Sequence, residues 1–250
     1  MHNLAAISSI SLTHPAHKLW VFAALTALFA VLGRLVRGVT TGGALAGAAL
    51  CFALLVGAGL GGFAALLTLF VLTWTSTRIG YARKQSLGTA EARAGRNAAQ
   101  VLANVGVAAL CAALFAILRD PRLLVAAGAA LSEAAADTVS SEIGQAVGGS
   151  PRMVTNWRPV QAGTDGAITV TGTLAGVGAV VVVSLTCIVI GVFGWAQFLP
   201  SAGAAAAGMF ADSFLGATLE RRGVLGNNGV NFLSTAIAAG LATMLCSLRA

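Results

Sequence analysis

Long apolar stretches without a single charged side chain dominate the sequence. Residues 38–77, 97–118, 166–211 and 223–248 contain no Asp, Glu, Lys or Arg, and residues 19–33 form a shorter stretch of the same kind. These runs are continuous and rich in Ala, Leu and Gly, whereas a membrane-spanning β-strand alternates polar and apolar positions. The pattern therefore predicts an all-α protein.

The longest stretches exceed one membrane crossing, because a helix needs about 20 apolar residues to span a bilayer. Residues 38–77 predict two passes joined between Gly57 and Gly62, and residues 166–211 predict two passes broken near Pro200. With the remaining stretches this gives about eight spans, within a range of about seven to nine, in one polytopic transmembrane bundle.

One predicted span differs from the others because it carries charge. Residues 123–144 are apolar apart from Glu133, Asp137 and Glu142. We count this segment as a full span, although a re-entrant segment here or at 204–219 stays open. All the spans are expected to form a single integral-membrane domain that covers the whole chain of 250 residues.

Composition supports the membrane assignment. Hydrophobic residues make up 57% of the chain and charged residues 9%, whereas soluble domains carry roughly 25% charged residues. Such a chain lacks the polar groups to cover a water-facing globule, which excludes an ordinary soluble enzyme, a disordered chain and a disulfide-rich secreted module. Each carboxylate in an apolar segment is costly and therefore calls for a physical reason.

The basic residues predict the orientation of the bundle. Of the 15 Lys and Arg residues, 11 lie on one side of the predicted spans and four on the other. The positive-inside rule then places both termini outside the cell. The four are Lys18, Arg119, Arg122 and Arg249. The 11 are Arg34, Arg37, Arg78, Arg83, Lys84, Arg93, Arg96, Arg152, Arg158, Arg221 and Arg222, of which Arg78, Arg83 and Lys84 are expected to touch lipid headgroups.

Polar residues at the span ends gather on the side of the 11 bases. At the start of the fourth span, Arg93, Asn97, Gln100 and Asn104 share one helical stripe. Further polar residues lie at the ends of the fifth and seventh spans, in a Gly-flanked loop and at the start of the eighth span. At the end of the fifth span these are Glu133, Asp137, Ser140, Ser141 and Glu142, and the loop is Gly163 to Gly166. At the end of the seventh span they are Asp212, Ser213, Gly216 and Glu220, and at the start of the eighth Asn227, Asn228 and Asn231.

The position of Glu142 does not fit a regular helix that serves a single site. It lies about 140° around the helix from Asp137. Either the helix unwinds near Ser140 and Ser141, or Glu142 serves a different neighbour.

This set of side chains predicts a magnesium–polyphosphate site that opens to the cytoplasm. Carboxylates without His or Cys suit a hard cation such as Mg²⁺, and helix starts and Gly-rich loops suit phosphates. All three histidines lie in the first 17 residues, so a histidine base in the core is excluded. None is needed if the acceptor is itself an ionised phosphate.

Other interpretations of the same residues stay open. Glu133 and Asp137 would hold a proton or a sodium ion in a transporter. Asn97, Gln100 and Asn104 would form hydrogen bonds between helices. The Gly-flanked loop would be a plain turn.

A weak internal repeat adds a second pattern. The triplet ADT at 136–138 recurs as ADS at 211–213, and GTDG at 163–166 recurs as GNNG at 226–229. This repeat predicts two half-sites that meet at a pseudo-symmetric interface.

Five ordered segments resemble the signatures of a widespread integral-membrane family. The family was long catalogued as a domain of unknown function and includes the plant phytyl-phosphate kinase. The order and spacing match over residues 20–248. The segments are RNAAQVLANVG (96–106), SEAAADTVSSEIG (132–144), GTDGAITVTGTLAG (163–176), ADSFLGATLE (211–220) and NNGVNFL (227–233).

The resemblance implies a Mg²⁺-dependent kinase that converts an isoprenyl (phytyl or polyprenyl) monophosphate to the diphosphate, with CTP or another nucleoside triphosphate as donor. It implies that catalysis and Mg²⁺ binding fall to Asp137, Glu142, Asp165 and Asp212. It implies that phosphates are bound by Arg96, Asn97, Gln100, Asn104, Thr138, Gly163, Thr164, Gly166, Asn228 and Asn231. Many relatives carry Thr near Ser141, whose hydroxyl would take the same role.

The expected partners are an isoprenyl-phosphate lipid, a nucleoside triphosphate and the bilayer, with no nucleic acid. The plastid-targeting segment of the plant enzymes is absent, which favours a bacterial plasma (inner) membrane with the active site facing the cytoplasm. Two alternatives remain. One is a carrier for an anionic metabolite or ion. The other is a cytidylyltransferase that forms a CDP-lipid, because the motif pattern is also similar to that of dolichol kinases and CDP-lipid synthases.

Overall fold

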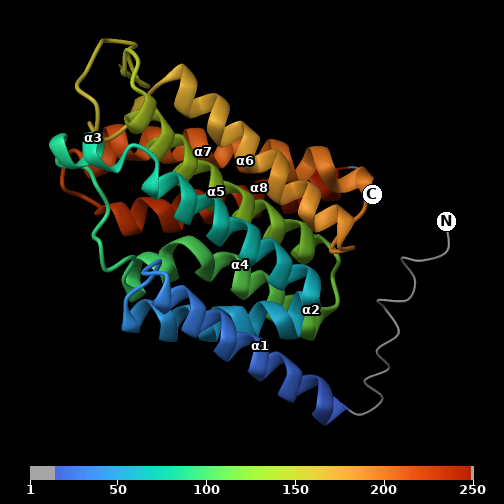
Figure 1. The fold of residues 1–250 in the computed structure, drawn as a ribbon. Helices are drawn as coiled ribbons and strands as arrows, with labels where there is room; N and C mark the ends of the chain where they lie inside the picture. Colours follow the sequence, from blue (N-terminus) through green and yellow to red (C-terminus); the bar gives the residue numbers. More distant parts are fainter. Residues whose placement is uncertain (1–14, 249–250) are drawn as a thin grey trace, which may run out of the picture.

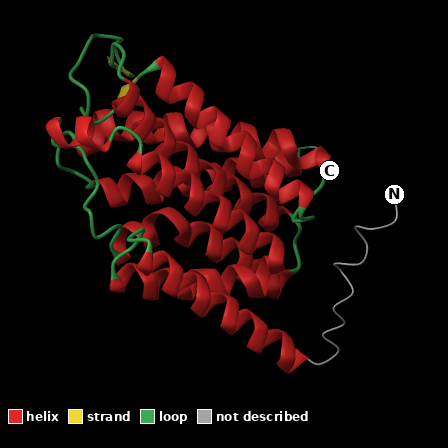
Figure 2. Ribbon diagram, viewed as in Figure 1, coloured by secondary structure: helices red, strands yellow, loops and turns green. Residues whose placement is uncertain are grey.

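A bundle of α-helices makes up nearly all of the computed structural model, which describes residues 15–248 (Figures 1 and 2). The strands in that range, β1 (Arg152–Met153) and β2 (Ala167–Ile168), form one short antiparallel pair. The all-α prediction is thus confirmed. The helices are α1 (Pro15–Leu35), α2 (Thr41–Arg78), α3 (Tyr81–Ser86), α4 (Ala98–Leu118), α5 (Arg122–Val147), α6 (Val170–Val189), α7 (Phe198–Leu215) and α8 (Asn227–Ser247).

Helix α2 folds back on itself at Gly59. A straight helix of its 38 residues would be about 57 Å long, yet Arg78 at its end donates to the carbonyl of Val36 just before its start, at 2.6 Å. The reversal falls at Gly59, where φ is 63° and ψ is −155°, a conformation open only to glycine. The predicted turn between two passes is therefore confirmed.

Six helices, namely α1, α2, α4, α5, α6 and α8, are long and apolar enough to cross a membrane. Because α2 contains two arms, these helices provide seven passes. Helix α7, which packs beside α5 and α8, occupies the position of the seventh of the eight predicted spans. Helix α5 runs unbroken over 26 residues, so it does not unwind near Ser140. The short π-helix η3 (Gly216–Glu220) extends α7.

The outer faces of the bundle are apolar. Ile117 and Val189 are each 76% exposed and Val170 is 78% exposed. Exposed apolar surface of this extent is typical of contact with lipid.

Helix α5 lies at the centre of the bundle, where it packs against α2, α4, α6, α7 and α8. Of its membrane-length window, 78% is buried, compared with 17% for the peripheral helix α1. Glycines permit this close packing. A Cβ on Gly172 of α6 would lie 2.5 Å from the carbonyl oxygen of Ser140, and one on Gly176 would lie 2.5 Å from the sulfur of Met209.

One end of the bundle, which we call the polar end, collects the charged chain segments. It contains the C-terminal ends of α1, α5 and α7, both ends of α2, the starts of α4, α6 and α8, and the short helix α3 (Figure 1). The 11 bases assigned to one side all lie on these segments. Arg249, assigned to the other side, falls outside the described residues.

Candidate functional site

A polar cavity of about 280 Å³ opens at the polar end. Its walls are formed by α4, α5, α7 and α8 and by the loop before α6. All five family-like motifs, including the GTDG loop, thereby contribute to one space. Of the 15 residues predicted for the site, 13 line this cavity, namely Arg96, Gln100, Asn104, Asp137, Thr138, Ser141, Glu142, Gly163, Thr164, Asp165, Gly166, Asp212 and Asn231.

Two aspartates from different helices face each other in this cavity. Asp137 on α5 and Asp212 on α7 both line this cavity, and their carboxyl groups interact with each other. Ser234 on α8 donates to Asp212 Oδ2 at 3.0 Å and so fixes its orientation. Two facing carboxylates repel each other when both are ionised, so such a pair either shares a proton or takes a cation between its oxygens.

An unpaired amide oxygen lies close to this pair. Asn231 donates from Nδ2 to Asn104 Oδ1 at 3.4 Å, and its own Oδ1 is buried without a hydrogen-bond partner. Ser234, which binds Asp212, also donates to the backbone carbonyl of Asn231. A buried acceptor without a donor is costly unless a cation or water completes it.

These oxygens fit a hard divalent cation. Mg²⁺ in proteins takes one or two carboxylates and completes its shell with water and phosphate oxygens, and Asp137 with Asp212 offers such a pair. Within residues 15–248, no three His, Cys, Asp or Glu side chains are spaced to hold a metal ion. Asp165 and Glu142 thus lie in the cavity wall without forming a single four-carboxylate group, and the metal assignments stay predictions.

Glu142 already has a positively charged partner. Its carboxylate forms an ion pair with Lys84 on α3, whose side chain is fully buried. Lys84 also donates to the carbonyls of Thr77 at 2.7 Å and Ser76 at 3.1 Å. The expectation that Lys84 touches lipid headgroups is wrong. Glu142 serves a different neighbour, which was the second of the two alternatives for its position on α5.

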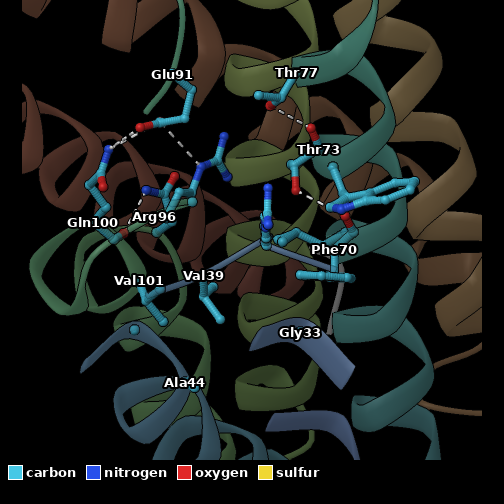
Figure 3. A pocket seen from close by; sticks show the side chains of 18 of the residues that line it. Gly33, Val39, Ala44, Phe70, Thr73, Thr77, Glu91, Arg96, Gln100 and Val101 are labelled. Carbon is cyan, nitrogen blue, oxygen red and sulfur yellow. Dashed lines mark hydrogen bonds and ion pairs between the residues drawn. The ribbon is translucent and has the colours of Figure 1, made fainter. Parts of the chain in front are cut away.

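Arg96, just before α4, lines the cavity. Its guanidinium donates to Thr138 Oγ1 at 3.3 Å. It also lies 3.9 Å from Glu91, as Figure 3 shows from another side. Gln100 donates to the same carboxylate at 3.2 Å. The backbone of Arg96 is paired with the segment between α1 and α2, through Arg96 N to Gly38 O and Thr40 N to Arg96 O.

The start of α4 differs from the predicted helical stripe. The helix begins at Ala98, and Asn97 is its N-cap in a reciprocal capping box with Gln100. Asn97 therefore lines no part of the cavity, and Arg93 and Arg96 precede the helix. The N-x-x-Q spacing before an apolar run is itself a capping signature, so this start was readable from the sequence.

The GTDG loop is a tight turn that packs against η3. Ala167 N donates to Thr164 O at 2.9 Å, and a Cβ on Gly166, where φ is +76°, would lie 2.5 Å from the backbone nitrogen of Ala217. The plain-turn interpretation is correct for the backbone, and the turn also forms one wall of the cavity. Beyond α7, burial and then the carboxylates of Asp165 and Asp137 raise the pKa of Glu220.

The balance of charge in the cavity is strongly acidic. Its lining contains one base, Arg96, and six acids, namely Glu91, Asp137, Glu142, Asp165, Asp212 and Glu220. A polyphosphate would be repelled by this wall on its own. It would bind only together with cations that the carboxylates attract.

The start of α8 presents backbone donors toward this acidic space. Its N-cap, Gly226, has no side-chain cap, so the positive end of the helix dipole is open to an anion. Asn227 lines the cavity here, whereas the predicted Asn228 does not.

Among the lining residues that were not foreseen from the sequence are Thr89 and Glu91. Both lie in the charged segment between α3 and α4, in which we considered only the basic residues. The alternation of Thr89 and Glu91 with Arg93 and Arg96 was the sequence signal that could have indicated their place in the site.

The fold and the cavity define an integral membrane helical bundle with one acidic polar pocket at its charged end. Residues 24–239 match the family model described as integral membrane protein DUF92. The chain belongs to this family, which confirms the family suggested by the five motifs.

Individual relatives agree with the family assignment. An uncharacterized membrane protein of Methanocaldococcus jannaschii is 35% identical over 73% of this chain and 76% of its own length. Protein PGR of Arabidopsis thaliana is 29% identical over 73% of this chain and 81% of its own. Chloroplastic protein VTE6 of the same plant is 32% identical over 47% of this chain and 37% of its own. No solved structure gives a significant match.

Proposed function

We propose that the protein is a membrane phosphotransferase that moves a phosphoryl group from CTP or another nucleoside triphosphate to an isoprenyl monophosphate. The observation that carries the proposal is the convergence of 13 of the 15 motif residues on one acidic cavity. The family-like motifs imply a kinase of isoprenyl phosphates, and the cavity supplies the side chains that such a reaction needs.

The acidic part of the cavity is the donor side. Asp137 and Asp212 would hold Mg²⁺, which when bound neutralises the polyphosphate and the charge of its transferring group. The turn from Gly163 to Gly166 and the uncapped start of α8 would orient the phosphates through backbone N–H groups.

Arg96 would orient the acceptor phosphate. An ionised acceptor oxygen attacks the terminal phosphorus of the donor, the bond to the bridging oxygen breaks, and the electron pair leaves on the nucleoside diphosphate. The products are the isoprenyl diphosphate and the nucleoside diphosphate, and no proton moves. No catalytic base is required, so the chemistry falls to positioning and charge neutralisation.

The polar end is proposed to face the cytoplasm of a bacterial plasma membrane. The positive-inside rule favours this side because the 11 bases lie there. Nucleoside triphosphates are available on that side.

The test is a product assay with purified protein in detergent, Mg²⁺, CTP or ATP, and farnesyl or phytyl phosphate. Formation of the isoprenyl diphosphate with release of the nucleoside diphosphate is expected. Release of pyrophosphate with CMP left on the lipid would instead indicate a cytidylyltransferase. Absence of product from every donor and acceptor pairing would overturn the proposal.

One observation favours a second candidate, a carrier for an anion or ion. Glu133 is 1% exposed at the bundle centre, and both of its carboxyl oxygens lack a hydrogen-bond partner. Buried unpaired carboxyls are typical of ion pathways in membrane proteins. Nucleotide-independent uptake into proteoliposomes that disappears in Glu133→Gln would support the carrier, and Mg²⁺-dependent nucleotide binding would count against it.

A further inference from the structure

A second cavity, of about 300 Å³, lies beside the polar one (Figure 3). It is enclosed by α1, the two arms of α2 and the start of α4. We call it the apolar cavity, because its inner walls are formed by residues such as Phe29, Val39, Leu66, Phe70 and Val101.

Glycines keep the apolar cavity open. Gly33 and Gly47 line it, and a Cβ at these positions would meet other side chains only at 3.5 Å and 3.9 Å, respectively. Both lie in helices, where glycine is less favourable than alanine. Their value to the protein is therefore the space that they leave.

The mouth of the apolar cavity is basic. Four arginines line it, Arg37, Arg78, Arg93 and Arg96, with Glu91 as the one acid. Arg78 is held in place because its guanidinium lies 3.8 Å from the Trp74 ring centroid and donates to Val36 O. An apolar interior with a fixed cationic rim suits a molecule with a hydrocarbon chain and an anionic head.

The two cavities share a wall. Glu91, Arg96, Gln100 and Asn104 line both of them. Arg96 reaches Thr138 on the polar side, and Thr138 is next to Asp137 in the sequence. A phosphate bound at Arg96 would thus present its oxygens to the acidic cavity while its substituent entered the apolar one.

We propose that the apolar cavity binds the isoprenyl chain of the phosphorylated acceptor lipid, with the phosphate at Arg96. This inference rests on the proposed function and specifies which cavity binds the acceptor chain and how much of that chain the protein contacts. The apolar cavity has a finite volume of about 300 Å³. The protein therefore recognises only the isoprene units nearest the phosphate, and the rest of a longer chain lies in the bilayer.

The first experiment measures kcat/KM for acceptors of increasing chain length. We expect a rise of at least about tenfold over the first isoprene units, from dimethylallyl to farnesyl phosphate, and less than about threefold from farnesyl to phytyl phosphate. A steady rise up to phytyl phosphate, or no dependence on chain length, would overturn the inference while leaving a kinase intact.

The second experiment fills the cavity with Gly47→Leu. Its matched control is Gly178→Leu on α6, where a Cβ would meet nothing within 4 Å. Gly47→Leu should raise KM for geranyl and farnesyl phosphate by about tenfold relative to Gly178→Leu, with a smaller change for dimethylallyl phosphate. Equal kinetics in the two variants would contradict the proposed chain site.

Direct binding separates this inference from the proposed function. Trp74 lines the apolar cavity, so its fluorescence should change when farnesyl phosphate binds without nucleotide, and Trp74→Phe should remove that signal. A signal that Gly47→Leu weakens and Gly178→Leu preserves supports the chain site even if no diphosphate forms. An equal signal with phosphatidic acid would show that the cavity holds an ordinary bilayer lipid and would overturn the inference.

Discussion

The two cavities at the polar end differ in charge although they share one wall. The polar cavity is lined by six acids and one base, and the apolar cavity by four arginines and one acid. Both include Glu91, Arg96, Gln100 and Asn104. The acidic side would therefore require cations to bind a polyphosphate, whereas the basic side would bind a lipid phosphate directly.

This contrast explains how a chain with 9% charged residues would distinguish two phosphorylated substrates. In the proposed function, each substrate would be selected by the sign of the charge around it and by the polarity of the space behind it. Arg96 lies at the boundary because its backbone is paired with Gly38 and Thr40 and its side chain contacts Thr138. Changes on one side should therefore affect one substrate, and changes at the wall should affect both.

The largest expected effect comes from the facing aspartates. Asp137→Asn and Asp212→Asn should each lower kcat by at least about 100-fold, because each removes a ligand for the cation that neutralises the donor. Thermal unfolding in detergent should show equal or greater stability, because a like-charge contact is lost. The matched control is Asp120→Asn, which lies at the opposite end of the bundle and should retain activity. Normal kcat in both variants would show that the pair is structural.

The ion pair between Lys84 and Glu142 should contribute to the free energy of unfolding. Lys84→Met leaves Glu142 without its partner, and breaking a buried pair costs about 3–5 kcal/mol. Thermal unfolding of Lys84→Met, Glu142→Gln and the double variant measures this cost and the coupling between the residues. Additive losses would show that the two side chains do not interact.

The wall shared by the two cavities can be tested at two glycines that both have a positive φ. Gly95 and Gly88 have φ values of +84° and +73°, but a Cβ on Gly95 would lie 2.5 Å from Val39 N, whereas one on Gly88 would meet nothing within 4 Å. Both alanine variants should lose about 1–2 kcal/mol of stability from backbone strain. Only Gly95→Ala should also displace Arg96 and raise KM for both substrates. A KM change confined to one substrate would contradict a common wall.

The smallest effect is expected at Glu220. Folding raises its pKa above the ordinary value of 4.5, through burial and then the carboxylates of Asp165 and Asp137. The folded state thus retains a proton that the unfolded chain releases, and stability falls as pH rises from 4.5 to the raised pKa. Glu220→Gln should be slightly more stable than wild type at neutral pH and should lose this advantage below pH 4.5. The advantage is measured as a difference in unfolding temperature.

The sequence predicted those features that depend on continuous patterns. Apolar length and glycine placement predicted the reversal at Gly59, and the one-sided distribution of polar residues predicted the position of the cavity. The burial of Lys84 was not predictable in the same way. Its acceptors are carbonyls of Ser76 and Thr77 and the distant Glu142, so only the folded chain brings them together.

The apolar cavity was also invisible in the sequence. Gly43 and Gly47 lie four residues apart in the sequence, a spacing that indicates helix packing. Gly43 does pack, because a Cβ there would collide with the Arg96 carbonyl, whereas Gly47 lines the apolar cavity, where a Cβ would meet Val101 only at 3.9 Å. A pattern of small residues does not distinguish a close contact from a void, because the difference depends on the opposing helices.

The most direct test of two differently charged cavities is the dependence of each substrate's binding on divalent cations. Binding of CTP or ATP and of farnesyl phosphate to the purified protein is measured with Mg²⁺ and then with a chelator. Nucleotide binding should disappear in the chelator while farnesyl phosphate remains bound at similar affinity. Nucleotide binding that persists without divalent cations, or farnesyl phosphate binding that is lost with them, would contradict the account.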